Sequence, residues 1–121
     1  MIFKILKMGV KFLKTLQKHK EELIKNLTKD GFKAQEKQID YDDEIYCVKA
    51  QKRVFILFNR TFIYLLTKEV DSKKLKELIK LIKSKFLSYH IIWLAADSFS
   101  EEVKEFAENN QQIGLLNIDV K

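Results

Sequence analysis

Residues 91–116 read IIWLAADSFSEEVKEFAENNQQIGLL, and this stretch decides the fold class. Its first six residues, 91–96, are all apolar, which predicts a strand that is buried on both faces of a sheet. Ser98 followed by Glu101 matches a capping box and predicts the start of a helix. A last short strand is expected at 114–120. The succession of strand, helix and strand predicts an α/β domain.

The residues before this stretch predict one more helix and three strands. Ser72 is expected to cap a helix that runs to about Phe86, with leucines and isoleucines along one side. The strands are expected at 32–40, 44–50 and 54–58. The third is apolar throughout, so burial on both sheet faces is expected again, with 61–66 extending it or forming another strand.

The N-terminal segment, residues 1–29, has a helical period of apolar residues and ends at Asp30-Gly31, where glycine suits a left-handed helix end. A helix of this length would be roughly 43 Å long, so we expect a break near Gly9 or a projecting first half. The segment has eight lysines against Glu21 and Glu22, and so carries the whole formal charge of +6. One stripe of the helix consists of Lys4, Lys7, Lys11, Lys14 and Lys18.

Composition predicts a single domain, 1–121, and a cytoplasmic location. With 46% hydrophobic and 33% charged residues, the chain can bury a core. Cys47 is the only cysteine, which excludes an internal disulfide and suits a reducing compartment. No apolar run approaches the ~18 residues of a membrane span, and the early lysines interrupt any signal-peptide core. We expect no integral membrane association.

Three segments resemble the Mrr-like restriction-endonuclease family. Residues 22–32, ELIKNLTKDGF, are similar to its opening helix and Gly-aromatic strand, and 91–116 to its closing strand, "FS" helix start and final strand. Residues 44–60 fall on its catalytic hairpin. The resemblance implies a restriction-endonuclease-like three-layer fold, with a mixed sheet of about five strands flanked by helices in the order α-β-β-β-α-β-α-β. The first three strands would form an antiparallel meander, and 91–96 would lie centrally.

The resemblance also implies which residues would form an active site. The family holds a divalent metal on an Asp and a Glu or Gln, and a Lys two residues later steadies the developing charge. These positions fall on Glu44, Leu57 and Asn59, with Asp43 or Asp42 as alternatives for the first. Two of the three functional groups are therefore missing, which predicts a degenerate site with no cofactor. Mg²⁺ or Mn²⁺ would be required, with Glu44 and Asp43 as ligands, if the chain were an active nuclease.

Two alternatives remain for these carboxylates. An active metal-dependent endonuclease could use a relocated site built from Glu36, Asp42, Asp43 and Lys49. Alternatively, 42–44 is only a solvated turn before a strand.

Basic residues make DNA the expected partner. The lysine stripe of the N-terminal helix and a second row, Lys73, Lys76, Lys80 and Lys83, could contact phosphates, although solvation alone also explains lysines on helix surfaces. Arg60, Phe62 and Tyr64 alternate on one strand face and could stack on bases. The leading prediction is a catalytically degenerate DNA-binding domain. A third function class is a protein-interaction or assembly subunit whose N-terminal helix pairs with another chain or with a second copy. A homodimer would form through Ile2, Ile5, Leu6, Leu13 and Leu16.

Overall fold

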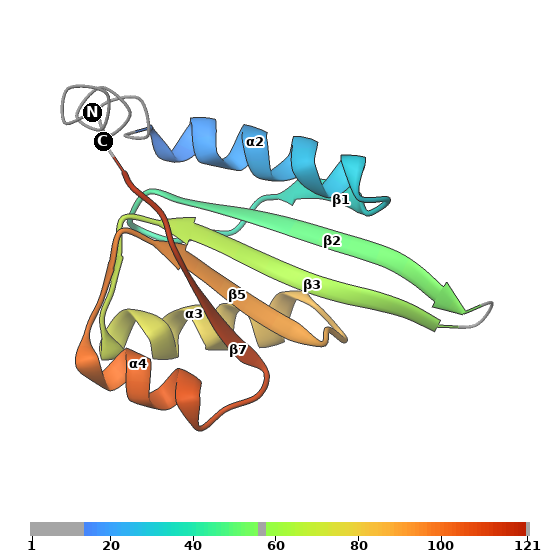
Figure 1. Cartoon of the computed structure of the whole chain (residues 1–121). Coiled ribbons are helices and arrows are strands. Elements are labelled where there is room, and N and C mark those ends of the chain that lie inside the picture. Colours follow the sequence, from blue (N-terminus) through green and yellow to red (C-terminus); the bar gives the residue numbers. More distant parts are fainter. Residues whose placement is uncertain (1–13, 56–57, 121) are drawn as a thin grey trace, which may run out of the picture.

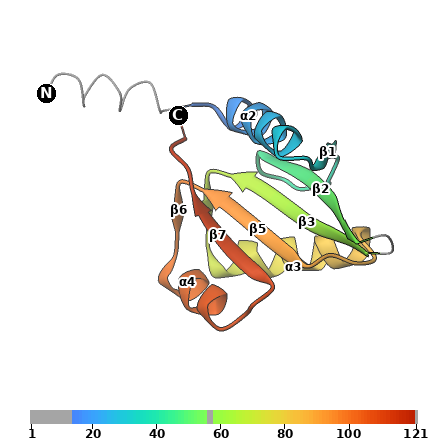
Figure 2. The same ribbon diagram turned by 45° about the vertical axis from the view of Figure 1, so that its right-hand side comes forward.

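A five-stranded mixed sheet organises the protein, with helices on both of its faces (Figures 1 and 2). The computed structural model describes residues 14–55 and 58–120. The helices are α2 (Leu16–Lys29), α3 (Ser72–Lys85) and α4 (Glu101–Glu108). The strands are β1 (Lys33–Lys37), β2 (Ile45–Phe55), β3 (Phe58–Thr67), β4 (Glu69–Val70), β5 (Ile91–Ala96), β6 (Ser98–Phe99) and β7 (Ile113–Asn117).

The sheet has the strand order β1-β2-β3-β5-β7. Strands β1, β2 and β3 form an antiparallel meander, while β5 is parallel to both β3 and β7. A separate two-residue parallel ladder joins β4 to β6. The predicted meander and the predicted central place of residues 91–96 are therefore confirmed. The predicted order of elements is also confirmed, with the short β4–β6 ladder as an addition.

The two faces of the sheet contribute to two core clusters. Leu16 and Leu27 of α2 pack on Val48, Ala50 and other side chains of one face. The inner sides of α3 and α4 pack on the opposite face, through Leu75, Leu78, Ile82 and Val103. This layered arrangement follows from the period-2 alternation of β2 and β3, which sends successive side chains to opposite faces. None of the described helices combines the length and apolarity needed to cross a membrane.

The prediction of a doubly buried third strand at 54–58 is wrong. Residues Val54 and Phe55 end β2, and Phe58 begins β3. Val54 is 48% exposed, because the β2–β3 ladder continues beyond the part of the sheet that the helices cover. The buried central part of β3 lies further along, where Ile63, Leu65 and Leu66 are almost fully buried. The apolar residues Val54 and Phe55 belong to the end of a long hairpin. Periodicity alone cannot distinguish such an end from a strand that is buried on both faces.

Helix caps differ from the expected ones by one or two residues. Asp71, not Ser72, caps α3, since its carboxylate accepts a hydrogen bond from the Lys74 backbone N–H at 2.8 Å. Ser100, not Ser98, caps α4. In both helices, the capping side chain accepts a hydrogen bond from the backbone N–H three residues later, which has no partner within the helix.

The described N-terminal helix is shorter than predicted. Helix α2 begins at Leu16 after the cap Thr15, and Lys14 instead makes a bridge with Val120. At the other end, Gly31 has a φ of +90°, so the predicted glycine helix end is confirmed. The expected break near Gly9 falls outside the described residues.

Candidate functional site

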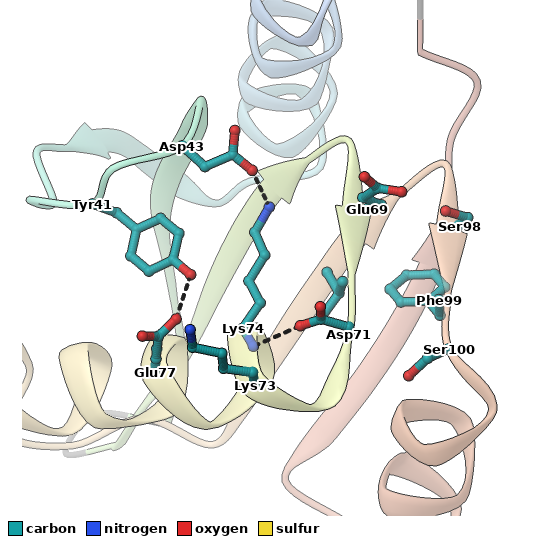
Figure 3. Close-up of a pocket in the computed structure, with 11 residues that line it drawn as sticks. Tyr41, Asp43, Glu69, Asp71, Lys73, Lys74, Glu77, Ser98, Phe99 and Ser100 are labelled. Atoms are coloured by element: carbon teal, nitrogen blue, oxygen red, sulfur yellow. Dashed lines mark hydrogen bonds and ion pairs between the residues drawn. The ribbon is translucent and has the colours of Figure 1, made fainter.

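A pocket of about 580 Å³ opens where the loop before β2 meets the start of α3 and the β4–β6 ladder (Figure 3). The loop supplies Tyr41 and Asp43, while the first turns of α3 supply lysine and glutamate side chains. The lining residues are Tyr41, Asp43, Glu69, Val70, Asp71, Lys73, Lys74, Glu77, Ser98, Phe99 and Ser100.

Lys74 is the central cation of this pocket. It lies in the first turn of α3, and its side chain is only 10% exposed. Its ammonium donates hydrogen bonds to Asp43 Oδ2 at 2.6 Å and to Thr67 Oγ1 at 2.6 Å. The Thr67 hydroxyl in turn donates to the backbone carbonyl of Glu44 at 3.1 Å. A buried ammonium requires such partners, because its desolvation costs several kcal/mol when no partner is present.

Asp43 has both carboxylate oxygens engaged. Oδ2 accepts from Lys74, and Oδ1 accepts from the backbone N–H of Glu44 at 2.9 Å. The hydrogen bond from Lys74 holds the pKa of Asp43 below its ordinary value, and the Glu44 amide adds to this effect. The Asp43 side chain is 58% exposed, so water reaches the carboxylate and weakens the interaction. Asp43 is thus an ionised group held by the chain's own cation.

The rim of the pocket is acidic. Glu69, Asp71 and Glu77 join Asp43, so four carboxylates face the two ammonium groups of Lys73 and Lys74. The Tyr41 hydroxyl donates to Glu77 Oε1 at 2.8 Å, and burial together with this bond raises the pKa of Tyr41 to about 12. The Asp71 carboxylate is occupied by the helix cap. A bare phosphate would therefore meet net negative charge at this pocket.

The predicted catalytic residues are only partly brought together. Asp43 lines the pocket, and Glu44 contributes its carbonyl to the Thr67 bond. Asp42 lines a neighbouring hollow instead. Asn59 pairs with Arg53, which lies about eight residues and roughly 26 Å along the ladder from the start of β2 at Ile45. Leu57 lies outside the described residues.

The residue that does face the start of β2 is Thr67, because Ile45 pairs with Thr67 in the antiparallel register. Sequence reasoning missed both Thr67 and Lys74. A signal for Lys74 was present, since at 100° per residue it lies on the same side of α3 as Leu78 and away from Lys73. A lysine on the apolar side of a helix needs a buried partner, and Asp43 is that partner.

The relocated site proposed from the sequence does not converge. Glu36 forms an ion pair with Lys20 of α2 at 2.7 Å. Lys49 lies over the ring of Phe86, with its ammonium 6.0 Å from the ring centroid. Of that set, only Asp43 lines the main pocket.

The described basic residues are more dispersed than predicted. Lys73, Lys76, Lys80 and Lys83 are all exposed along α3, and Arg60 is exposed near the end of the β2–β3 hairpin. Lys18 is exposed on α2, whereas Lys14 forms an ion pair with Glu22 at 2.6 Å. Lys4, Lys7 and Lys11 lie outside the described residues. So do Ile2, Ile5, Leu6 and Leu13, and Leu16 is buried in this chain's own core.

The donor set does not suit the divalent metal that the family resemblance implies. Hard cations such as Mg²⁺ bind several carboxylate or carbonyl oxygens. Both carboxylate oxygens of Asp43 already accept hydrogen bonds. Thr67, which faces the start of β2, offers only a hydroxyl that is itself hydrogen-bonded. Within residues 14–55 and 58–120, no three His, Cys, Asp or Glu side chains are placed to hold a metal ion.

The sheet order, the flanking helices and the pocket at the start of β2 define a restriction-endonuclease-like α/β fold. One solved structure, described as EndoMS in apo form, is similar to this chain with a TM-score of 0.55 at 13% sequence identity. The match covers 82% of this chain and 44% of that chain, so this chain spans less than half of the neighbour's length. No protein-family profile and no curated protein matches the chain. The structural likeness shows the fold.

Proposed function

We propose that this chain is a cytoplasmic, Mrr-like nuclease-fold domain that binds DNA and does not cleave it. The observation that carries the proposal is the position of Lys74. Its ammonium sits between Asp43 and Thr67, so a side-chain cation neutralises Asp43, which the family resemblance offers beside Glu44 as a metal ligand. One cation facing one carboxylate leaves no divalent charge to polarise a phosphate or activate water.

The DNA-binding part of the proposal rests on α3. Lys73, Lys76, Lys80 and Lys83 recur every three or four residues, so they share one side of the helix. All four are exposed, and none forms an ion pair with the residues that the structure describes. Unpaired ammonium groups in a row suit the regular phosphates of a duplex and release its counterions on binding.

A cleavage assay tests the catalytic part. The protein is incubated with supercoiled and linear duplex DNA in Mg²⁺ and, separately, Mn²⁺, beside an Asp43→Asn variant. We expect no cleavage by either protein. Metal-dependent cleavage by the wild-type chain that disappears in Asp43→Asn would overturn the proposal.

A salt titration tests the binding part. Affinity for a duplex is measured between low and moderate salt for the wild type, for Lys76→Gln with Lys80→Gln, and for a control. The control is Lys25→Gln with Lys29→Gln, two exposed lysines of α2 with the same loss of charge. If both α3 lysines contact phosphates, the log–log slope should become smaller by about 1.8 in the first variant. Equal losses in the two variants would show that only net charge matters and would contradict a binding site on α3.

A second function, a metal-dependent nuclease, is favoured by the acidic rim. Glu69, Asp71 and Glu77 line one pocket with Asp43 and Lys74, and a divalent ion would offset the net negative charge of that rim. The carboxylates would have to move toward one another, since no three of the described His, Cys, Asp or Glu side chains are placed to hold a metal. This function requires Asp43 to exchange Lys74 for the metal. Direct Mn²⁺ binding by the wild type, lost in Asp43→Asn, would favour it over the first proposal. Assembly through the N-terminal residues stays a prediction.

A further inference from the structure

The sheet face on the α2 side is only partly covered by the described helices. Helix α2 lies over β1 and β2 and touches β3, while α3 and α4 lie on the opposite face (Figure 2). Tyr64 of β3 and Trp93 of β5 are direct neighbours in the parallel register and remain partly exposed. Two large aromatic side chains thus lie side by side at the boundary of the covered region.

Gly114 allows the Trp93 indole to lie flat. Trp93 pairs with Gly114 of β7, and a Cβ built at Gly114 would come within 2.3 Å of two carbons of the indole ring. Any other residue at 114 would displace the ring. The indole is nearly parallel to the Tyr64 ring, with an interplanar angle of 17° and centroids 6.4 Å apart. Gly114 of β7 therefore leaves room for a flat aromatic surface formed by Tyr64 of β3 and Trp93 of β5.

Two cations flank this surface on the same sheet face. Strand alternation places Arg60 on the face of Phe62 and Tyr64, and Lys52 is the cross-strand partner of Arg60. Both are exposed. Lys52 donates to the Asp30 carbonyl at 3.0 Å, and its ammonium lies 5.3 Å from the Phe32 ring centroid, so it also has a structural role. Arg60 lies directly opposite a like charge, which destabilises a hairpin, so the sheet alone gives no reason for an arginine there. Residues 45–67 contain four basic residues and no Asp or Glu, so no acidic group of the hairpin sequence offsets them.

We propose that this face binds single-stranded nucleic acid, with Tyr64 and Trp93 stacking on unpaired bases and Arg60 and Lys52 contacting the backbone phosphates. Aromatic rings stack on bases of any sequence, and adjacent cations neutralise the strand. A duplex keeps its bases paired and offers no exposed ring faces to such a surface. This site is separate from the lysine row of α3, which belongs to the opposite layer, so either site can fail without the other.

Trp93 is the chain's only tryptophan, so intrinsic fluorescence reports directly on the site. Wild-type protein is titrated with an oligothymidylate of about eight nucleotides, a length within the site sizes of small single-strand-binding domains. We expect saturable quenching of Trp93 and a log–log salt slope of about −0.7 for each phosphate engaged. A duplex of equal length should compete poorly.

Variants separate stacking from simple charge. Tyr64→Leu keeps apolar volume but removes one ring, and affinity should fall about 5- to 150-fold, the range for one stacked base. Arg60→Gln should lower affinity and flatten the salt slope. Gly114→Ala should weaken binding by displacing the indole, with circular dichroism used to check folding. Tyr89→Leu is the matched control, since Tyr89 packs on the core of the other face.

Three results would overturn the proposal. The first is an unchanged Trp93 signal at saturating oligothymidylate. The second is resistance of Trp93 to quenching by acrylamide, which would show that another part of the chain or a second copy covers this face. The third is equal competition by duplex. Loss of duplex affinity in the Lys76 and Lys80 variant, with oligothymidylate binding intact, would show that the two proposals stand independently.

Discussion

The contact between Asp43 and Lys74 gives the sharpest test of the pocket. We consider a double-mutant cycle made of Asp43→Asn, Lys74→Met and the two together. Lys74→Met keeps the length of a side chain on the apolar side of α3, and Thr67 keeps its hydrogen bond to the Glu44 carbonyl. Asp43→Asn instead leaves a largely buried ammonium with the Thr67 hydroxyl and water as partners. The two single changes should therefore have unequal costs.

The expected magnitudes follow from burial. The Lys74 side chain is 10% exposed and that of Asp43 is 58% exposed, so the pair lies between a surface salt bridge and a buried one. Surface pairs contribute about 0.2–1 kcal/mol, and breaking a fully buried pair costs about 3–5 kcal/mol. After discounting for the solvent at Asp43, we expect Asp43→Asn to cost about 1–2 kcal/mol. Lys74→Met should cost less than about 1 kcal/mol, with a coupling of about 1 kcal/mol.

Urea denaturation at neutral pH measures each corner of the cycle. The control cycle uses Lys104→Met and Glu101→Gln, an exposed pair on α4 with side chains 52% and 88% exposed. That coupling should stay below about 0.5 kcal/mol. If both cycles gave the same small value, the account of Lys74 as a buried, partnered cation would be refuted.

The pH dependence of unfolding provides a second test of the contact between Asp43 and Lys74. Hydrogen bonding lowers the pKa of Asp43 in the folded state below the unfolded value. The contribution of Asp43 is thus fully present above the unfolded carboxyl pKa and is lost as the pH falls through the lower, folded pKa. The wild type should lose more stability than Asp43→Asn across that acidic window.

Three further predictions concern local structure. Gly31→Ala should destabilise the protein by about 1 kcal/mol in thermal or urea unfolding, since φ is +90° there, whereas an unchanged stability would contradict the left-handed helix end. Asp71→Ala should cost about 1 kcal/mol through loss of the α3 cap, and Ser72→Ala should cost less. Cys47 should react with a thiol reagent only on unfolding, because burial raises its pKa to about 12, and rapid labelling of the native protein would contradict its burial.

Sequence reasoning predicted those parts of the fold that depend on local pattern. The helix at 72–85 has a clear helical period, and the strand at 91–96 is a short apolar run without interruption, so their existence and approximate bounds were predictable. The predicted strands 44–50 and 54–58 miss the β2–β3 hairpin because the polar residues Gln51, Lys52 and Arg53 between them favour a turn. These polar residues lie within β2, where the ladder passes beyond the covering helices and Lys52 and Arg53 are exposed. The prediction failed because the helices cover only part of the hairpin, and a local sequence pattern does not show how far they extend over the sheet.

The site was predictable only at Asp43. The β2–β3 hairpin is longer than predicted by several residues, which moves every cross-strand neighbour, so Asn59 pairs with Arg53 and lies far from Asp43 along the ladder. Thr67 faces the start of β2, and Lys74 arrives from a helix that follows in the chain. Contacts between residues 31 positions apart, such as Asp43 and Lys74, depend on packing of α3 and could not be derived from spacing.

The arrangement around Lys74 also explains how the pocket balances its own charge. Two carboxylates at a hairpin start repel each other and need a divalent ion, whereas one carboxylate is balanced by one ammonium. With a threonine at 67, the single carboxylate of Asp43 and the Lys74 ammonium balance each other and satisfy the buried hydroxyl between them. A metal site in this pocket would require a second carboxylate at 67 and the withdrawal of Lys74 together. Removal of Lys74 alone would leave Asp43 and the Thr67 hydroxyl without their shared donor, so the stability of the present pocket depends on Lys74.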